Sequence, residues 1–71
     1  MHFVVIRLLG TNEPLKAFGP FSSPAEAGHR LAVALNYSDA SIFAIAVEQN
    51  PDLGDAEVEG RWDGVSPQDR P

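Results

Sequence analysis

Few residues in this 71-residue chain could support catalysis. It has two histidines, His2 and His29, a handful of serines and no cysteine. Nucleophilic catalysis pairs a serine or threonine with a histidine and an orienting carboxylate, and no Gly-x-Ser-x-Gly turn frames any serine here. We interpret His29 as a solvated group on a helix flank, and the two histidines have no spacing that would bind zinc. The residues therefore predict a protein that is not an enzyme and that holds no metal and no cofactor.

Oxygen-bearing side chains concentrate in one acidic run, residues 50–59 (NPDLGDAEVE). A calcium loop of the EF-hand type needs acidic or amide ligands at alternate positions and a glutamate at position twelve. Gly54 stands where the third ligand should be. We interpret the run as a solvated acidic turn.

The net charge of −5 belongs to the C-terminal third of the chain. Residues 1–47 hold three acidic and three basic residues, whereas residues 48–71 hold seven acidic and two basic ones. Nucleic-acid binding draws most of its affinity from lysine and arginine side chains that neutralise phosphates. The charge distribution therefore argues against direct contact with nucleic acid.

The sequence also predicts a compartment. The N-terminal residues lack a basic start, and Arg7 interrupts the apolar run before it reaches the length of a signal-peptide core. No segment approaches the ~20 apolar residues of a membrane span. Small secreted domains usually depend on disulfides, which this chain cannot form. We expect a cytoplasmic protein that does not contact a membrane.

Hydrophobic patterning predicts a hairpin and one further strand around a helix. Residues 3–9 are apolar in both alternating sets, which is typical of a central strand covered on both faces. A turn cluster at 10–14 leads into a second strand at 15–19. Pro20 should end that strand or confine it to a sheet edge, because proline cannot donate to a ladder. Residues 41–47 are again apolar on both faces and form the third strand.

The start of the helix is strongly encoded. Ser23 can cap it, Pro24 fits the first helical position, and Glu26 completes a Ser-x-x-Glu capping box. We predict a helix from Pro24 to about Leu35, followed by a third strand that lies parallel to the second on the far side of the first.

The helix has an apolar stripe at helical spacing, formed by Ala27, Leu31, Ala34 and Leu35. Glu26 and Arg30 are expected to form an ion pair outside this stripe. Gly28 is either needed for close approach to the sheet or merely tolerated, and we favour tolerance.

The predicted fold class is α+β: a small β-β-α-β domain over residues 1–50, with an antiparallel sheet of order 2-1-3 and one helix on one face. Residues 51–63 are an acidic segment. Within it, residues 56–62 alternate small or apolar with charged residues, so they could add a fourth strand beside the third or dock Trp62 on this protein or a partner. Residues 64–71 are expected to be a disordered tail.

The stretch 18–27 (FGPFSSPAEA), followed by Leu31 and Leu35, resembles the repeat half of sporulation-related (SPOR) domains, in which a strand and Gly-x-Phe precede a helix with x-Glu-Ala-x-x-Leu. The resemblance implies a ferredoxin-like sheet whose face binds peptidoglycan stripped of its peptides. The chain departs from that family in having one helix, no export signal and no polar glycan-binding surface on its strands. The same stretch is similar to many small bacterial and phage proteins.

One helix covers one face of a sheet, so the other face would carry apolar residues from the first and third strands. A patch of this kind seldom stays exposed on a soluble monomer. We predict that a partner protein or a second copy, as a homodimer, binds there, with the acidic tail covering the face or adding a contact. The residues expected to form this surface are Phe3, Val5, Arg7, Phe43, Ile45, Glu57, Glu59 and Trp62.

Two other functions stay open at this point. The SPOR resemblance implies a binder of cell-wall glycan. Alternatively, the tail carboxylates could imitate nucleic-acid phosphates and block a nucleic-acid-binding protein, in the manner of a phage inhibitor.

Overall fold

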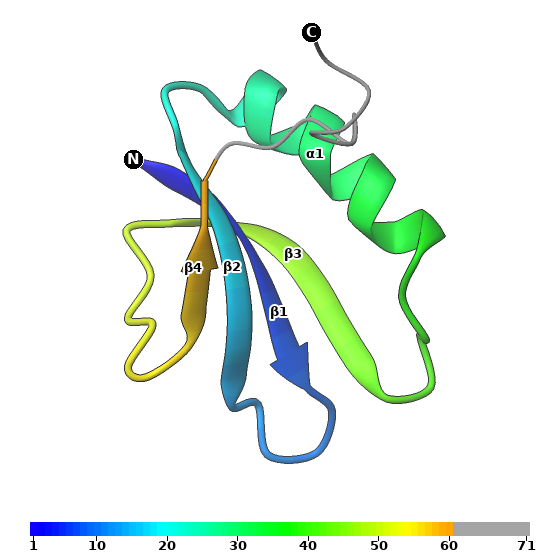
Figure 1. Ribbon diagram of the computed structural model, residues 1–71. Coiled ribbons are helices and arrows are strands. Elements are labelled where there is room, and N and C mark those ends of the chain that lie inside the picture. Colours follow the sequence, from blue (N-terminus) through cyan, green and yellow to red (C-terminus); the bar gives the residue numbers. More distant parts are fainter. Residues whose placement is uncertain (61–71) are drawn as a thin grey trace, which may run out of the picture.

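A mixed four-stranded sheet with one helix across one face makes up the structure, which is a computed structural model that describes residues 1–60 (Figure 1). Trp62 and the predicted tail at 64–71 lie outside the described residues. The strand order is β3-β1-β2-β4. In chain order the elements are β1 (His2–Leu8), β2 (Pro14–Phe21), α1 (Pro24–Asn36), β3 (Phe43–Gln49) and β4 (Glu57–Glu59).

β1 is an inner strand, as its two-sided hydrophobicity predicts. It pairs antiparallel with β2 on one side and with β3 on the other, so the expected order 2-1-3 is confirmed. Val4 faces α1 and Val5 faces away from it, and both have no exposed surface. Each face of the strand is therefore covered.

The capping box at the start of α1 differs in one detail from the expected form. The Ser23 hydroxyl accepts a hydrogen bond from the Glu26 amide at 3.3 Å, as predicted. The Glu26 carboxylate accepts from the amide and the hydroxyl of Ser22, at 3.2 and 2.8 Å, one residue further back than the box requires. The bond from the Glu26 amide satisfies a donor that the first helical turn leaves without an intrahelical partner, and the two bonds from Ser22 hold the residue before the cap.

The buried side of α1 includes an arginine. Ala27 and Ala34 are buried as expected, whereas Arg30, predicted outside the stripe, is only 3% exposed and Leu35, predicted within it, is 54% exposed. The physical reason is that the Arg30 guanidinium lies on the Phe18 ring, 3.7 Å from its centroid, and covers the aromatic face.

β3 begins and ends two residues later than predicted. The Asp39 carboxylate accepts hydrogen bonds from the Ser41 amide and hydroxyl at 2.9 and 2.6 Å, and its backbone oxygen accepts from the Ile42 and Phe43 amides. This turn delays the strand until Phe43. At the other end, Glu48 stays in the strand, where it binds Arg7 of β1.

β4 exists, but it lies beside β2, in parallel, and not beside β3 as predicted. The sheet is therefore mixed and not antiparallel throughout. Charge favours this side of the sheet, because β2 offers Lys16 to Glu59, whereas the only charged side chain of β3 is Glu48. Pro20 lies beyond residues 16–18, the part of β2 that pairs with β4. On that side, Pro20 therefore faces no neighbouring strand among the described residues.

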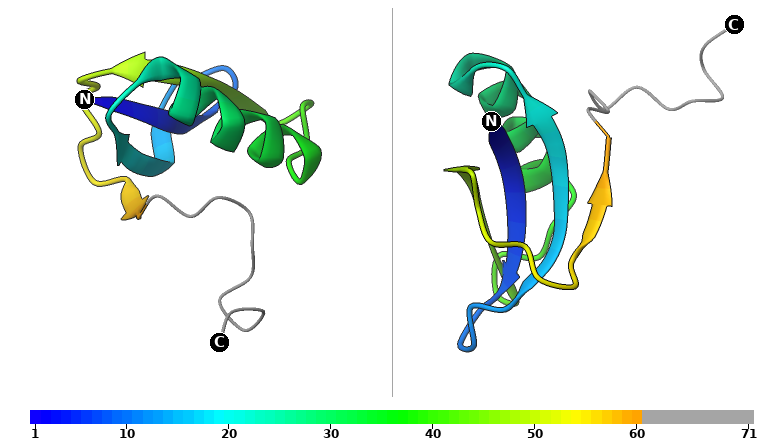
Figure 2. Two further views of the ribbon diagram at one scale, coloured as in Figure 1. Left: turned by 90° about the horizontal axis from the view of Figure 1, so that it is seen from above. Right: turned by 90° about the vertical axis from the view of Figure 1, so that its left-hand side faces the viewer.

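Residues 50–56 carry the chain from β3 to β4, across the sheet face opposite α1 (Figure 2). The connection turns at Asn50 and Gly54, whose φ angles are +47° and +52°. It starts with a hydrogen bond from the Asn50 amide to the Met1 carbonyl. The second face of the sheet is thus crossed by the chain itself.

Two glycines provide a matched test of this packing. A methyl group at Gly28 would meet no atom within 4 Å, whereas one at Gly19 would lie 2.8 Å from Phe3 Cδ2 and 3.0 Å from the His2 carbonyl oxygen, at a φ of +147°. We expect Gly28→Ala to raise the free energy of unfolding by about 0.5–1 kcal/mol. Gly19→Ala should lower it by about 1–3 kcal/mol. Urea denaturation followed by circular dichroism measures both, and equal effects of the two variants would contradict the packing described.

Candidate binding groove

The predicted interaction residues divide between the two faces of the sheet. Phe3, Val5 and Arg7 alternate with the helix-facing residues of β1 and lie on the face opposite α1. Phe43 and Ile45 were expected beside them, and this is wrong. Ile45 packs against the core under α1, and Phe43, two residues earlier in β3, lies on the same face. The residues of β3 on the far face are therefore Ala44, Ala46 and Glu48.

The far face is more closed than predicted. Phe3 lies against Gly19 of β2, and Val5 is fully buried. The 50–56 connection passes over this face (Figure 2). Its Pro51 and Leu53 are half-buried. Within residues 1–60, the apolar residues of β1 on this face are therefore at least half-buried, which removes much of the exposed surface on which the predicted docking site depended.

An ion pair completes the far face. Arg7 donates from Nε and Nη2 to the two carboxylate oxygens of Glu48, at 2.8 and 2.7 Å, and from Nη1 to the Asn12 carbonyl at 2.9 Å. Two-point contact between guanidinium and carboxylate is the strongest geometry for such a pair. The hydrogen bonds from Arg7 hold the pKa of the Glu48 carboxyl below its usual value.

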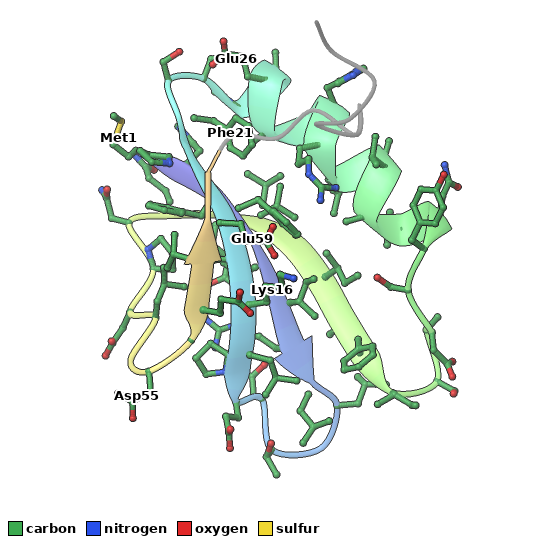
Figure 3. All side chains as sticks on the ribbon, viewed as in Figure 1. Met1, Lys16, Phe21, Glu26, Asp55 and Glu59 are labelled. Carbon is green, nitrogen blue, oxygen red and sulfur yellow. The ribbon has the colours of Figure 1, made fainter. Side chains whose placement is uncertain are left out.

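The acidic side chains of β4 lie on the helix side. Glu59 forms an ion pair with Lys16 of β2, and Lys16 Nζ lies 5.7 Å from the Phe18 ring centroid (Figure 3). The Arg30 guanidinium lies on the same ring, and burial lowers its pKa, whereas the charge of Glu59 acts in the opposite direction. Glu59 is thus held by a basic cluster, while Glu57 is exposed.

A groove opens where α1 stops short of the sheet. The helix ends at Asn36, and the lower ends of β1, β2 and β3 have no helix over them (Figure 1). The groove has a volume of about 460 Å³, within the usual size range of ligand sites. Its lining comes from each of the four strands and from the residues that directly follow the helix: Ile6, Leu15, Lys16, Tyr37, Ser38, Asp39, Phe43 and Glu57.

The groove combines an apolar floor with an acidic rim. Ile6, Leu15 and Phe43 supply apolar surface, and Tyr37 stands at the rim with 86% of its surface exposed. Asp39 and Glu57 contribute carboxylates, and the hydrogen bonds from Ser41 lower the pKa of the Asp39 carboxyl.

The helix end adds to this negative potential. The last turn of α1 contains no basic residue, so its terminal carbonyl groups add partial negative charge without a neutralising side chain on the helix. The one lysine of the groove, Lys16, is already paired with Glu59.

This arrangement suits binding more than bond-breaking. An apolar surface beside carboxylates can hold a group that has a hydrophobic part and a positive charge. Of the groove residues, sequence reasoning found Phe43 and Glu57, for other reasons, and missed Leu15, Tyr37 and Asp39. The available signal was Tyr37, a large aromatic residue directly after the helix.

Comparison with protein-family models, with curated proteins and with solved structures gives no match to this chain. The SPOR resemblance therefore stays a prediction. Within residues 1–60, no helix has the length and apolar character needed to cross a bilayer. No three histidine, aspartate or glutamate side chains of that range are grouped as metal ligands would be.

The Arg7–Glu48 pair predicts a dependence of stability on acidity. Because the pKa of Glu48 is lower in the folded state, its contribution is present above its ordinary value of 4.5 and is lost as the pH falls through the folded-state pKa. We expect the loss of unfolding free energy between pH 7 and pH 3, measured by urea denaturation, to be smaller in Glu48→Gln than in the wild type. Asp39 accounts for part of the remaining loss, since its pKa is also lowered.

Glu13→Gln is the matched control, because Glu13 is an exposed carboxylate in the β1–β2 turn. It should keep the pH dependence of the wild type. A Glu48→Gln variant with unchanged pH dependence would contradict the role assigned to the ion pair.

Proposed function

We propose that this protein is a non-enzymatic interaction module that binds a segment of a partner protein in the groove beyond the C-terminal end of α1. The observation that carries the proposal is an apolar floor framed by an exposed tyrosine and two carboxylates. The segment that fits has an apolar side chain followed by a basic one, and an arginine is the best match because its guanidinium both stacks on aromatic rings and pairs with carboxylates.

The far face of the sheet is the weaker candidate. Its apolar residues are crossed by the 50–56 connection, and the Arg7–Glu48 pair satisfies its charges. The groove, by contrast, keeps its aromatic and acidic groups accessible. We therefore place partner binding in the groove, and we propose a cytoplasmic location because the chain lacks cysteine.

The test uses a defined probe, N-acetyl-Phe-Arg-amide, titrated into the ¹⁵N-labelled protein. Chemical-shift changes should concentrate at the groove residues Ile6, Leu15, Tyr37 and Phe43. Glu57→Gln should weaken binding by about two- to fivefold, the range of an exposed ion pair. Glu13→Gln, which removes a carboxylate outside the groove, should leave the affinity unchanged.

A second probe isolates the charge. N-acetyl-Phe-citrulline-amide has nearly the same shape and no positive charge, so it should bind more weakly, and the difference should shrink as salt is added. Equal binding of the two peptides, or shifts that map to the far face of the sheet, would overturn the proposal.

A further inference from the structure

The hydrogen bonds that flank the β1–β3 ladder show which way each backbone group of β3 points. The Leu9 amide donates to the Ile42 carbonyl, and the Asn50 amide donates to the Met1 carbonyl. Both pairs continue the register in which Val4 faces Val47. Bonded and non-bonded pairs alternate along an antiparallel ladder, so the residues of β3 that bond to β1 are Ala44, Ala46 and Glu48.

The intervening residues of β3 point their backbone groups away from β1, toward the open edge of the sheet. Phe43 is the exception, because its amide donates to the Asp39 carbonyl at 3.0 Å. The amides of Ile45, Val47 and Gln49 have no hydrogen-bond partner among residues 1–60. They form a row of three donors with their carbonyl acceptors along one edge.

This edge lacks the features that usually prevent strand pairing. The β1–β3 register runs without a bulge from His2 to Leu8, and β3 contains no proline and no lysine. The opposite edge is protected, since β4 has only three residues, two of them glutamates. A long, regular and mostly apolar edge strand is a template for another strand.

The side chains of β3 point to a second copy of the chain as that strand. Phe43, Ile45 and Val47 remain half-buried on the helix side, and the exposed Ala44 and Ala46 on the other side leave room for a neighbour. The only charged side chain of β3, Glu48, is already neutralised by Arg7. Two copies can therefore approach at this edge without like-charge repulsion, although the chain as a whole is acidic.

We propose that β3 pairs antiparallel with β3 of a second copy, in a register centred on Val47. Val47 then faces Val47 of the second copy, and Ile45 of each copy faces Gln49 of the other. All three free amides of each chain find carbonyl partners in this register. The ladder ends beyond these three residues, where Phe43 would face Pro51 of the second copy. The Phe43 amide already donates to Asp39, and proline has no amide hydrogen to donate.

The resulting dimer has a continuous eight-stranded sheet. A two-fold axis perpendicular to the sheet keeps both α1 helices on one face, and the half-buried Ile45 and Val47 side chains of the two copies pack against each other. Phe43 is the residue of β3 that lines the groove, and its amide takes no part in this pairing, so the dimer is independent of the function proposed above.

Sedimentation velocity on a dilution series tests the association. The wild type should dimerise, and Gln49→Pro should weaken the dimer by about tenfold or more, because it removes one outward-facing donor in each copy. Gln49→Ala is the matched control, since it shortens the same exposed side chain, keeps the amide and should leave dimerisation unchanged. Circular dichroism confirms that each variant is folded.

Crosslinking tests the register without depending on the proline variant. The chain has no cysteine, so Val47→Cys introduces one thiol per copy, about 5.5 Å apart between Cα atoms at the two-fold axis, which a disulfide can bridge. Mild oxidation should convert this variant to a covalent dimer, whereas Ala44→Cys, far from the axis, should stay uncrosslinked. A monomeric wild type, no crosslink at Val47, or equal crosslinking at Ala44 would overturn the proposal.

Discussion

The structure depends on one constraint, which is that β1 must be covered on both faces. Val4 and Val5 are adjacent in sequence, point to opposite sides and are both fully buried. A single helix of 13 residues can cover one side only. The chain satisfies the other side with the 50–56 connection, the Phe3 side chain over Gly19 and the Arg7–Glu48 pair. In a chain this small the connecting segment has to contribute to the core, because there is little other surface to bury.

Charge favours the observed position of the acidic segment beside β2. Its carboxylates gain little from β3, whose own charged residue is Glu48, and gain an ion pair from Lys16 on β2. The Phe18 ring connects this pair to the helix, since Arg30 stacks on the same ring. Residues from β2, α1 and β4 thus form one cluster, in which an arginine on the buried side of the helix lies near a counter-charge from the acidic segment.

Both proposed interaction surfaces lie where the fold leaves part of the sheet uncovered or unpaired among the described residues. The helix is shorter than the sheet that it covers, which leaves a groove at its C-terminal end with aromatic and acidic walls. Because β4 pairs with β2, β3 is left as a regular edge strand whose outward-facing amides are unpaired among the described residues. One surface fits a basic, apolar segment, and the other fits a copy of itself.

The sequence by itself determined the types of the first four elements, the helix start and the central position of β1, because these follow from local capping chemistry and from the pattern of apolar residues around Val4 and Val5. It also indicated that Gly28 is merely tolerated, which the open space around that position supports. Only the tertiary structure decided which face each residue of β3 occupies, since a strand that is apolar on both sides carries no signal of orientation. The same holds for the buried position of Arg30 and for the pairing of β4 with β2, because both depend on Phe18 and Lys16, partners that lie far away in the sequence and come close only when the sheet forms.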